Sequence, residues 1–201
     1  MYATCRSCNS FGGRAYVPAY TDFVASTLDA LVNWGSAYIH ASPPPRLRMS
    51  AVIQPGAVIR QVLHMLLTAS GGPGLGERYP TLRSIVLEQS TSPLPSNIRI
   101  YLSLVITSRI RINSVQARMN LNSGAVVAMA EVAGPPFAWL LEIDGDGSNQ
   151  SQDVSNWTTL DPGRTEAVDI NTTLGSIVNP FAGDYRHRWQ VEEDSRRERL
   201  Q

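Results

Sequence analysis

The chain has 201 residues, 43% of them hydrophobic, and its 17 basic residues balance its 17 acidic residues. This length and composition predict one domain with enough apolar residues for a packed core. No apolar run reaches the roughly 18 residues that a membrane-spanning helix needs, and the first 20 residues lack the apolar segment of a secretory signal. We therefore expect no membrane span and no secretion through a signal peptide.

The neutral total hides an uneven distribution of charge. All 17 basic residues are arginine. Residues 1–120 contain 11 Arg and 4 acidic residues, which gives +7, and residues 121–201 contain 6 Arg and 13 acidic residues, which gives −7. Such asymmetry indicates polyanion contact by one half or head-to-tail pairing of subunits. The alternative is that the two halves fold against each other and their charges cancel.

The first 20 residues predict an irregular N-terminal arm, because they are rich in Gly, Ser, Tyr and Asn. The arm holds the two cysteines, Cys5 and Cys8, as a CxxC pair. A zinc site needs four ligands and no second pair exists, so free thiols are favoured. A helix follows over 22–34, with Thr21 as its N-cap, and the proline-rich segment 42–48 predicts a rigid connector.

A second helix begins at Pro55 and ends at the glycines 71 and 72. Its apolar positions fall on one side, and Arg60 and His64 fall on the other, which favours a solvent-exposed polar face. The glycine-rich segment 71–80 fits neither a P-loop nor a dinucleotide fingerprint, because it contains no lysine and follows a helix. It predicts a flexible connector.

From residue 81 onward the pattern predicts short strands. Period-two alternation covers 98–113 and changes parity near Ser114, which indicates a bulge or turn. A hairpin is expected around the turn at 122–124. The remaining predicted strands cover 81–89, 137–143, the region near 154–159, and 166–171. We expect an α+β fold, in which about eight short strands over 81–171 form a sandwich- or barrel-like body behind two amphipathic helices.

The candidate contact residues are arginines. Arg99, Arg109 and Arg111 share the non-core parity of the alternating segment, so we expect them to face a neighbouring subunit or nucleic-acid phosphates. Arg46 and Arg48 would add a weaker basic contact.

Asp144, Asp146 and Asp153 form an incomplete calcium-loop pattern, for which an acidic turn is the favoured interpretation. The sequence contains no GxSxG or HExxH motif and predicts no catalytic residue, no metal site and no cofactor.

Three parts are expected: an arm over 1–20, a globular domain over 21–180, and a charged C-terminal arm over 181–201. In architecture the chain resembles a small viral coat or other virion structural protein, by analogy and without a family motif. That resemblance implies self-association, other structural proteins and possible RNA or DNA contacts as partners, and a place in the virion or host cytoplasm. The alternatives are an arginine-based nucleic-acid-binding or regulatory module that acts as a monomer or dimer, and an enzyme whose site has no motif.

Overall fold

The computed structural model describes residues 6–38, 46–70, 74–105, 110–119, 124, 126–147, 149 and 151–173. Within these residues the chain forms helices and two antiparallel sheets, so the expected α+β class is confirmed. The larger sheet has the strand order β3-β4-β5-β2-β6, and the smaller one pairs β1 with β7. In this part of the chain the larger sheet is open, with β3 and β6 at its edges, so the expected sandwich- or barrel-like body is not confirmed.

The N-terminal segment is helical where an irregular arm was expected. Helix α1 (Arg6–Ala15) is followed directly by α2 (Val17–Tyr38), which contains the predicted helix over 22–34. Tyr16, between the two helices, is fully buried, and its hydroxyl donates to the Val86 carbonyl oxygen at 2.6 Å. This contact ties the N-terminal helices to the body of the protein. Cys5, the arm 181–201 and Arg109 lie outside the described residues.

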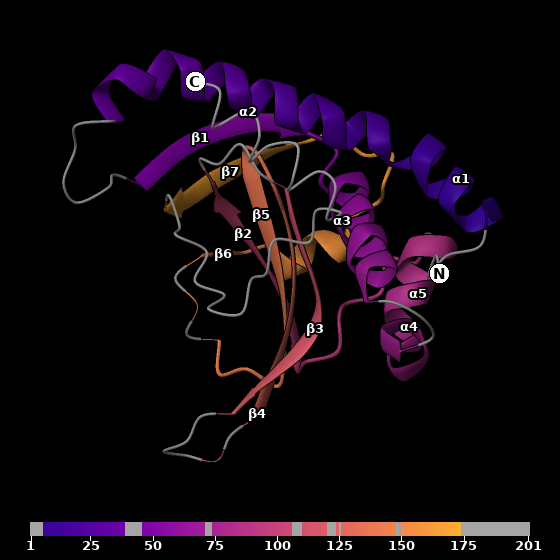
Figure 1. The fold of residues 1–201 in the computed structure, drawn as a ribbon. Helices are drawn as coiled ribbons and strands as arrows, with labels where there is room; N and C mark the ends of the chain where they lie inside the picture. The colour runs from indigo at the N-terminus through magenta and orange to yellow at the C-terminus, as the bar shows by residue number, and fades with distance from the viewer. Residues whose placement is uncertain are drawn as a thin grey trace, which may run out of the picture.

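The smaller sheet joins two distant parts of the chain. Strand β1 (Arg46–Ile53) pairs antiparallel with β7 (Glu166–Thr173), from Arg46 opposite Thr173 to Ile53 opposite Glu166. The last residues of the predicted proline-rich connector thus belong to a strand. Helix α2 packs along β1, as Figure 1 shows.

Helix α3 (Pro55–Ala69) confirms the second predicted helix. The next two predictions are wrong, because the segment expected to be a connector and then a strand forms α4 (Gly74–Arg78) and α5 (Pro80–Leu87). Pro80 occupies the first turn of α5, where its missing N–H costs nothing. Leu82, Ile85 and Val86 are buried at helical spacing. This short apolar run fits the period of a strand as well as that of a helix, and in the structure it forms a helix.

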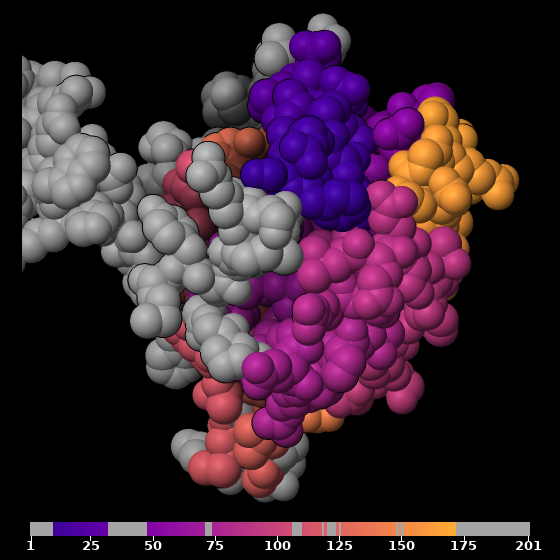
Figure 2. Space-filling view, turned by 90° about the vertical axis from the view of Figure 1, so that its right-hand side faces the viewer, coloured from indigo at the N-terminus to yellow at the C-terminus, as the bar shows by residue number. Residues whose placement is uncertain are grey.

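The larger sheet is built from β2 (Ile98–Leu104), β3 (Arg111–Met119), β4 (Val126–Gly134), β5 (Phe137–Ile143) and β6 (Gln152–Asp153). The β3–β4 hairpin is confirmed, and the β3–β4 register shifts between Asn113 and Gln116, where the parity change predicted a bulge. The predicted strand near 154–159 is instead a 3-10 helix, η1 (Ser155–Thr159). The hairpin projects beyond the other strands in Figure 1 and below the helices in Figure 2.

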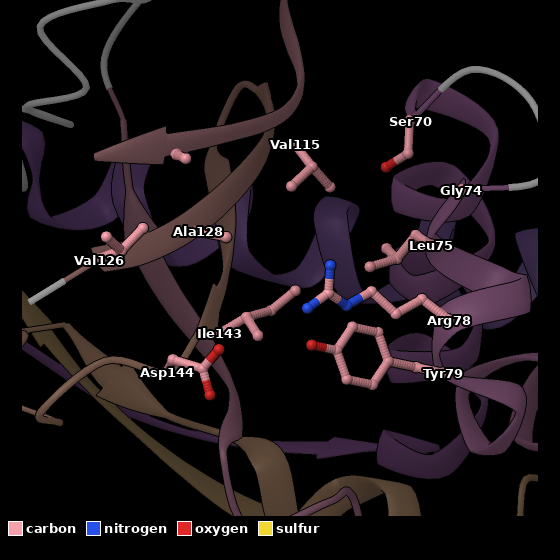
Figure 3. Close-up of a pocket in the computed structure, with 11 residues that line it drawn as sticks. Ser70, Gly74, Leu75, Arg78, Tyr79, Val115, Val126, Ala128, Ile143 and Asp144 are labelled. Atoms are coloured by element: carbon pink, nitrogen blue, oxygen red, sulfur yellow. The ribbon is translucent and has the colours of Figure 1, made fainter. Parts of the chain in front are cut away.

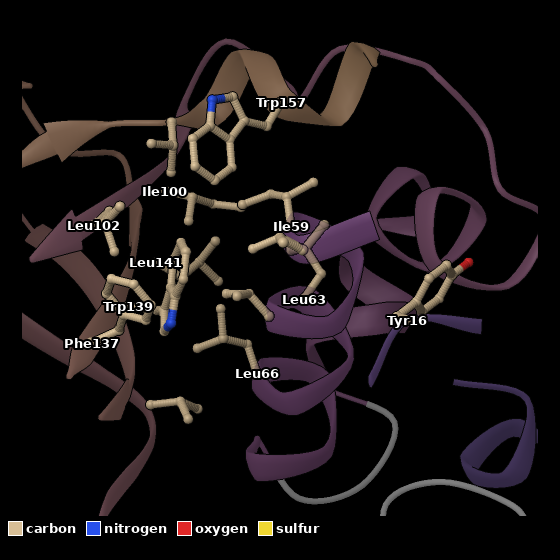
Figure 4. Close-up of a cluster of buried hydrophobic side chains, with 14 of the residues drawn as sticks. Tyr16, Ile59, Leu63, Leu66, Ile100, Leu102, Phe137, Trp139, Leu141 and Trp157 are labelled. Atoms are coloured by element: carbon tan, nitrogen blue, oxygen red, sulfur yellow. The ribbon is translucent and has the colours of Figure 1, made fainter. Parts of the chain in front are cut away.

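The core lies between one face of the larger sheet and α3. Ile100 and Leu102 of β2 and Trp139 and Leu141 of β5 face the helix, together with Trp157 of η1 (Figure 4). The helix contributes the fully buried side chains Ile59, Leu63 and Leu66. Phe23 of α2 closes the core, stacked on Phe137 with ring centroids 4.4 Å apart.

The predicted exposed face of α3 is wrong. Arg60 is fully buried and His64 is nearly so. The Arg60 guanidinium donates to five backbone carbonyl oxygens, those of Gly56 at 2.6 Å, Ser90 at 2.7 Å, Leu160 at 3.0 Å, Ile85 at 3.1 Å and Thr158 at 3.4 Å. Burial lowers the pKa of Arg60, and the nearby Asp161 carboxylate opposes that shift. Arg60 therefore holds α3, α5 and η1 together.

Candidate functional site

The alternating segment 98–113 supplies two separate strands. β2 lies inside the larger sheet and β3 forms its edge, with β5 and β4 between them. The register places Arg99 opposite Glu142 and Arg111 opposite Ala133, so both arginines lie on the sheet face away from α3. They share a face, as predicted, but they are not neighbours.

Each of these two arginines forms an ion pair with a carboxylate of the same chain. Arg99 Nη1 lies 3.1 Å from Asp153 Oδ2, and Arg111 Nη2 lies 3.1 Å from Glu131 Oε1. Both ion pairs join an arginine of the basic half to an acid of the acidic half. The expected alternative, in which the two halves fold against each other, therefore accounts for part of the charge asymmetry.

The same sheet face contains buried polar groups that bond to one another. Glu131 is fully buried and also accepts a hydrogen bond from Asn113 Nδ2 at 2.7 Å. Burial raises the pKa of Glu131, and Arg111 and Asn113 lower it in part. The Tyr101 hydroxyl donates to Glu142 Oε1 at 3.3 Å. Burial, with the Glu142 charge next in effect, raises the pKa of Tyr101 to about 12. These contacts link polar groups of neighbouring strands on this face of the sheet.

The other predicted contact arginines belong to the smaller sheet. Arg46 pairs with Thr173 through the β1–β7 ladder, and Arg48, opposite Asn171, is exposed. Arg48 lines a shallow hollow of about 490 Å³ together with Ser50 and Asp169. The structure therefore does not gather the described arginines into one surface.

The three aspartates of the incomplete calcium pattern have different surroundings. Asp144 Oδ1 accepts from Asn97 Nδ2 at 2.9 Å, and Asp153 is paired with Arg99. Asp146 is exposed. No group of three or more potential metal ligands occurs among the residues that the structure describes.

The edge of the larger sheet is an apolar surface that the sequence did not reveal. Large hydrophobic side chains of β3 and its flanks are exposed: Ile110, Ile112, Val115, Met119 and, at the start of β4, Val126. Ile112 is 42% exposed and Met119 is 57% exposed. Alternation alone placed the isoleucines in the core, but β3 extends beyond the helices that cover the inner strands.

A pocket of about 540 Å³ lies between α4 and the β3–β4 hairpin. Its apolar wall consists of small and branched side chains, namely Leu75, Val115, Ala117, Val126, Ala128 and Ile143. Its polar lining is contributed by Ser70, Arg78, Tyr79 and Asp144. Figure 3 shows the Arg78 guanidinium reaching into the pocket and the Tyr79 hydroxyl pointing toward Asp144. The volume lies within the usual range for small-molecule sites.

Local backbone geometry places these polar groups. Asp144 directly follows β5 and has a φ of 61°, a left-handed conformation that Asp and Asn tolerate. Arg78 ends α4, with its guanidinium carbon 5.9 Å from the centre of the Tyr79 ring. Arg78 and Tyr79 were not predicted as site residues, because they lie in the segment expected to be a connector.

Searches of family models, curated proteins and solved structures found no match to this chain. Among the described helices, none is both long and apolar enough to cross a membrane. The evidence for function is therefore the edge of β3 and the pocket beside it.

Proposed function

We propose that this protein is a structural protein that self-associates through the outer edge of β3, which has no further strand beside it among the described residues. The observation that carries the proposal is a nine-residue edge strand with Ile112, Val115 and Met119 exposed along it, and Ile110 exposed just before it. An edge strand presents unpaired backbone N–H and C=O groups, and most proteins protect such an edge with charges or a covering element. Exposed apolar residues beside such groups favour pairing with another strand.

The proposed partner is a second copy of the chain, because the edge is nearly symmetric about its bulge. In antiparallel pairing about the bulge, Ile112 of one copy lies opposite Ala117 of the other, and Ile110 lies opposite Met119. The β3–β4 and β4–β5 registers place Ile112 and Ala117 on the same face of the sheet. Apolar residues thus meet apolar residues in an interface related by a two-fold axis.

The charges of the edge determine how the association should respond to salt. The same pairing brings Arg111 opposite Arg118 of the second copy, and Glu131 already neutralises the Arg111 charge in part. Salt screens such repulsion between like charges. Self-association should therefore persist or strengthen at high salt, whereas phosphate binding weakens steeply.

An assembly built in this way fits the virion coat that the sequence led us to expect, and we propose that role as its biological form. The arginine-based nucleic-acid module receives less support. Arg99 and Arg111, the two described arginines of the alternating segment, are paired with Asp153 and Glu131. Phosphate binding there would compete with both ion pairs.

The test is size-exclusion chromatography with light scattering at low and high salt, with the 260/280 absorbance ratio recorded. We expect a discrete oligomer without nucleic acid at both salt concentrations. Ile112→Lys places a charge on the proposed interface and should give monomers. Val52→Lys is the matched control, because Val52 is a 75% exposed apolar residue of β1 in the smaller sheet.

Three outcomes would contradict the proposal. The first is a monomeric wild-type protein at high concentration. The second is an equal effect of Ile112→Lys and Val52→Lys on the oligomer. The third is an assembly that dissociates at high salt and loses nucleic acid as it does so, which would favour the nucleic-acid-binding alternative. Circular dichroism would show whether both variants are folded.

A further inference from the structure

We infer that the pocket between α4 and the β3–β4 hairpin binds a small zwitterion with an apolar body, such as a hydrophobic amino acid. Arg78 would take its carboxylate, Asp144 would take its ammonium group, and the apolar wall would hold the side chain. This inference concerns a ligand, and the pocket shares Val115, Ala117 and Val126 with the apolar edge of β3.

The first support is the pair of opposite charges in the lining of the pocket. Arg78 and Asp144 both line it, and the described residues show no ion pair between them. The contacts of Arg78 include the Tyr79 ring, and the described residues provide it with no carboxylate within ion-pair distance. Two unlike charges held apart in one pocket can each bind an opposite charge of one ligand.

The second support is that Asp144 is fixed in place. Its backbone N–H donates to the Asn97 carbonyl oxygen at 2.9 Å, and its Oδ1 accepts from Asn97 Nδ2 at 2.9 Å. Asn97 thus binds one carboxylate oxygen of Asp144, and the other oxygen, Oδ2, has no hydrogen-bond partner among the described residues. A carboxylate oriented in this way loses little side-chain freedom when an ammonium group binds.

The third support is the apolar part of the pocket lining. Val115 and Ala117 of β3 and Val126 and Ala128 of β4 line the pocket, and Leu75 of α4 faces them (Figure 3). Val115 and Val126 are exposed, so burying them against an apolar ligand removes apolar surface from water.

The three features together select the ligand class. A simple carboxylate would satisfy Arg78 and be repelled by Asp144, and a simple amine would have the reverse difficulty. A neutral apolar molecule would leave both charges partly desolvated without a partner, which is costly. A zwitterion on an apolar body satisfies the whole lining.

The test uses three probes with the same phenyl body, measured by isothermal titration calorimetry. L-phenylalanine carries both charges, 3-phenylpropanoate carries the carboxylate alone, and phenethylamine carries the ammonium alone. We expect L-phenylalanine to bind at millimolar concentrations, about tenfold or more tightly than either analogue, because each lost charged hydrogen bond weakens binding.

Two variants assign the charges. Arg78→Gln should abolish the preference for L-phenylalanine over phenethylamine, and Asp144→Asn should abolish its preference over 3-phenylpropanoate. Asparagine tolerates the left-handed backbone at position 144 and retains the oxygen that accepts from Asn97. The controls are Arg83→Gln and Asp22→Asn, at exposed positions outside the pocket lining, and they should leave both preferences unchanged.

Absence of binding by L-phenylalanine, equal binding of the three probes, or unchanged preferences in the two pocket variants would each overturn the inference. Repeating the titration with Ile112→Lys separates it from self-association, because Ile112 does not line the pocket. If binding fails while the edge still pairs, this inference alone is wrong.

Discussion

Replacing Arg60 with methionine tests what a fully buried guanidinium contributes to this fold. Arg60 contacts no carboxylate within hydrogen-bond distance among the described residues, and its charge is solvated by five backbone carbonyl oxygens. Methionine preserves much of the apolar stem and removes every donor. The carbonyl oxygens of Ser90 and Leu160, which belong to irregular segments, then lose a partner.

The expected change in the free energy of unfolding follows from two opposing effects. Four of the five bonds are no longer than 3.1 Å, and at roughly 1 kcal/mol each their loss costs about 4 kcal/mol. Removal of a buried charge works in the opposite direction, and apolar replacements of buried ions are sometimes neutral or stabilising. We expect the hydrogen bonds to dominate, because the guanidinium is so fully coordinated. Domains are typically stable by about 5–15 kcal/mol, so a loss of ~4 kcal/mol is large.

The assay is equilibrium urea unfolding, followed by circular dichroism and by tryptophan fluorescence, which reports on the buried Trp139 and Trp157. The control is Arg83→Met, an exposed arginine on α5, which should change stability by no more than about 0.5 kcal/mol. If Arg60→Met is as stable as the wild type or more stable, desolvation of the charge dominates and the argument is refuted.

Three further predictions concern stability. Gly56→Ala should destabilise the fold by about 1–3 kcal/mol, because the added Cβ would lie 2.6 Å from the Leu160 carbonyl oxygen. Gly13→Ala, where the added Cβ meets open space, should instead stabilise α1 by up to about 1 kcal/mol. Thermal unfolding of the two variants measures both effects. Burial lowers the pKa of His64 from 6.5, so the unfolded state binds the proton more tightly than the folded state. The free energy of unfolding should therefore fall as the pH drops below 6.5. Urea titrations of His64→Gln should no longer show this pH dependence. Burial raises the pKa of Glu131 from 4.5, so the free energy of unfolding should fall as the pH rises above 4.5. Glu131→Gln should reduce this dependence on pH. If the pH dependence is unchanged in His64→Gln or in Glu131→Gln, it does not come from the residue replaced.

The strands and helices with a clear period were predictable from the sequence. Pro55 and the stripe that follows it predicted α3, and the parity change near Ser114 predicted the bulge of β3. The segment 80–87 was not predictable, because eight residues with three buried positions fit a strand nearly as well as a helix. Helical packing of Leu82 and Val86 in the core decided between them.

The candidate sites were less predictable, because they depend on strand order and tertiary contacts. Alternation placed Arg99 and Arg111 on one face, but it could not show that Asp153 and Glu131 neutralise them. Nor could it show that β3 is an edge strand, which exposes Ile112 on the nominal core side. The pocket forms from segments distant in the chain, so it left no signal in the sequence.

Hydrogen exchange of the segment 110–119 at high and low protein concentration is the sharpest test of pairing through β3, because it measures the backbone groups that would pair. We expect amides of β3 to be protected in concentrated protein and to exchange faster on dilution, while the paired amides of β1 and β7 exchange at the same rate in both. If exchange in β3 does not change with concentration, in protein shown to associate, the copies meet through another surface and pairing through β3 is wrong.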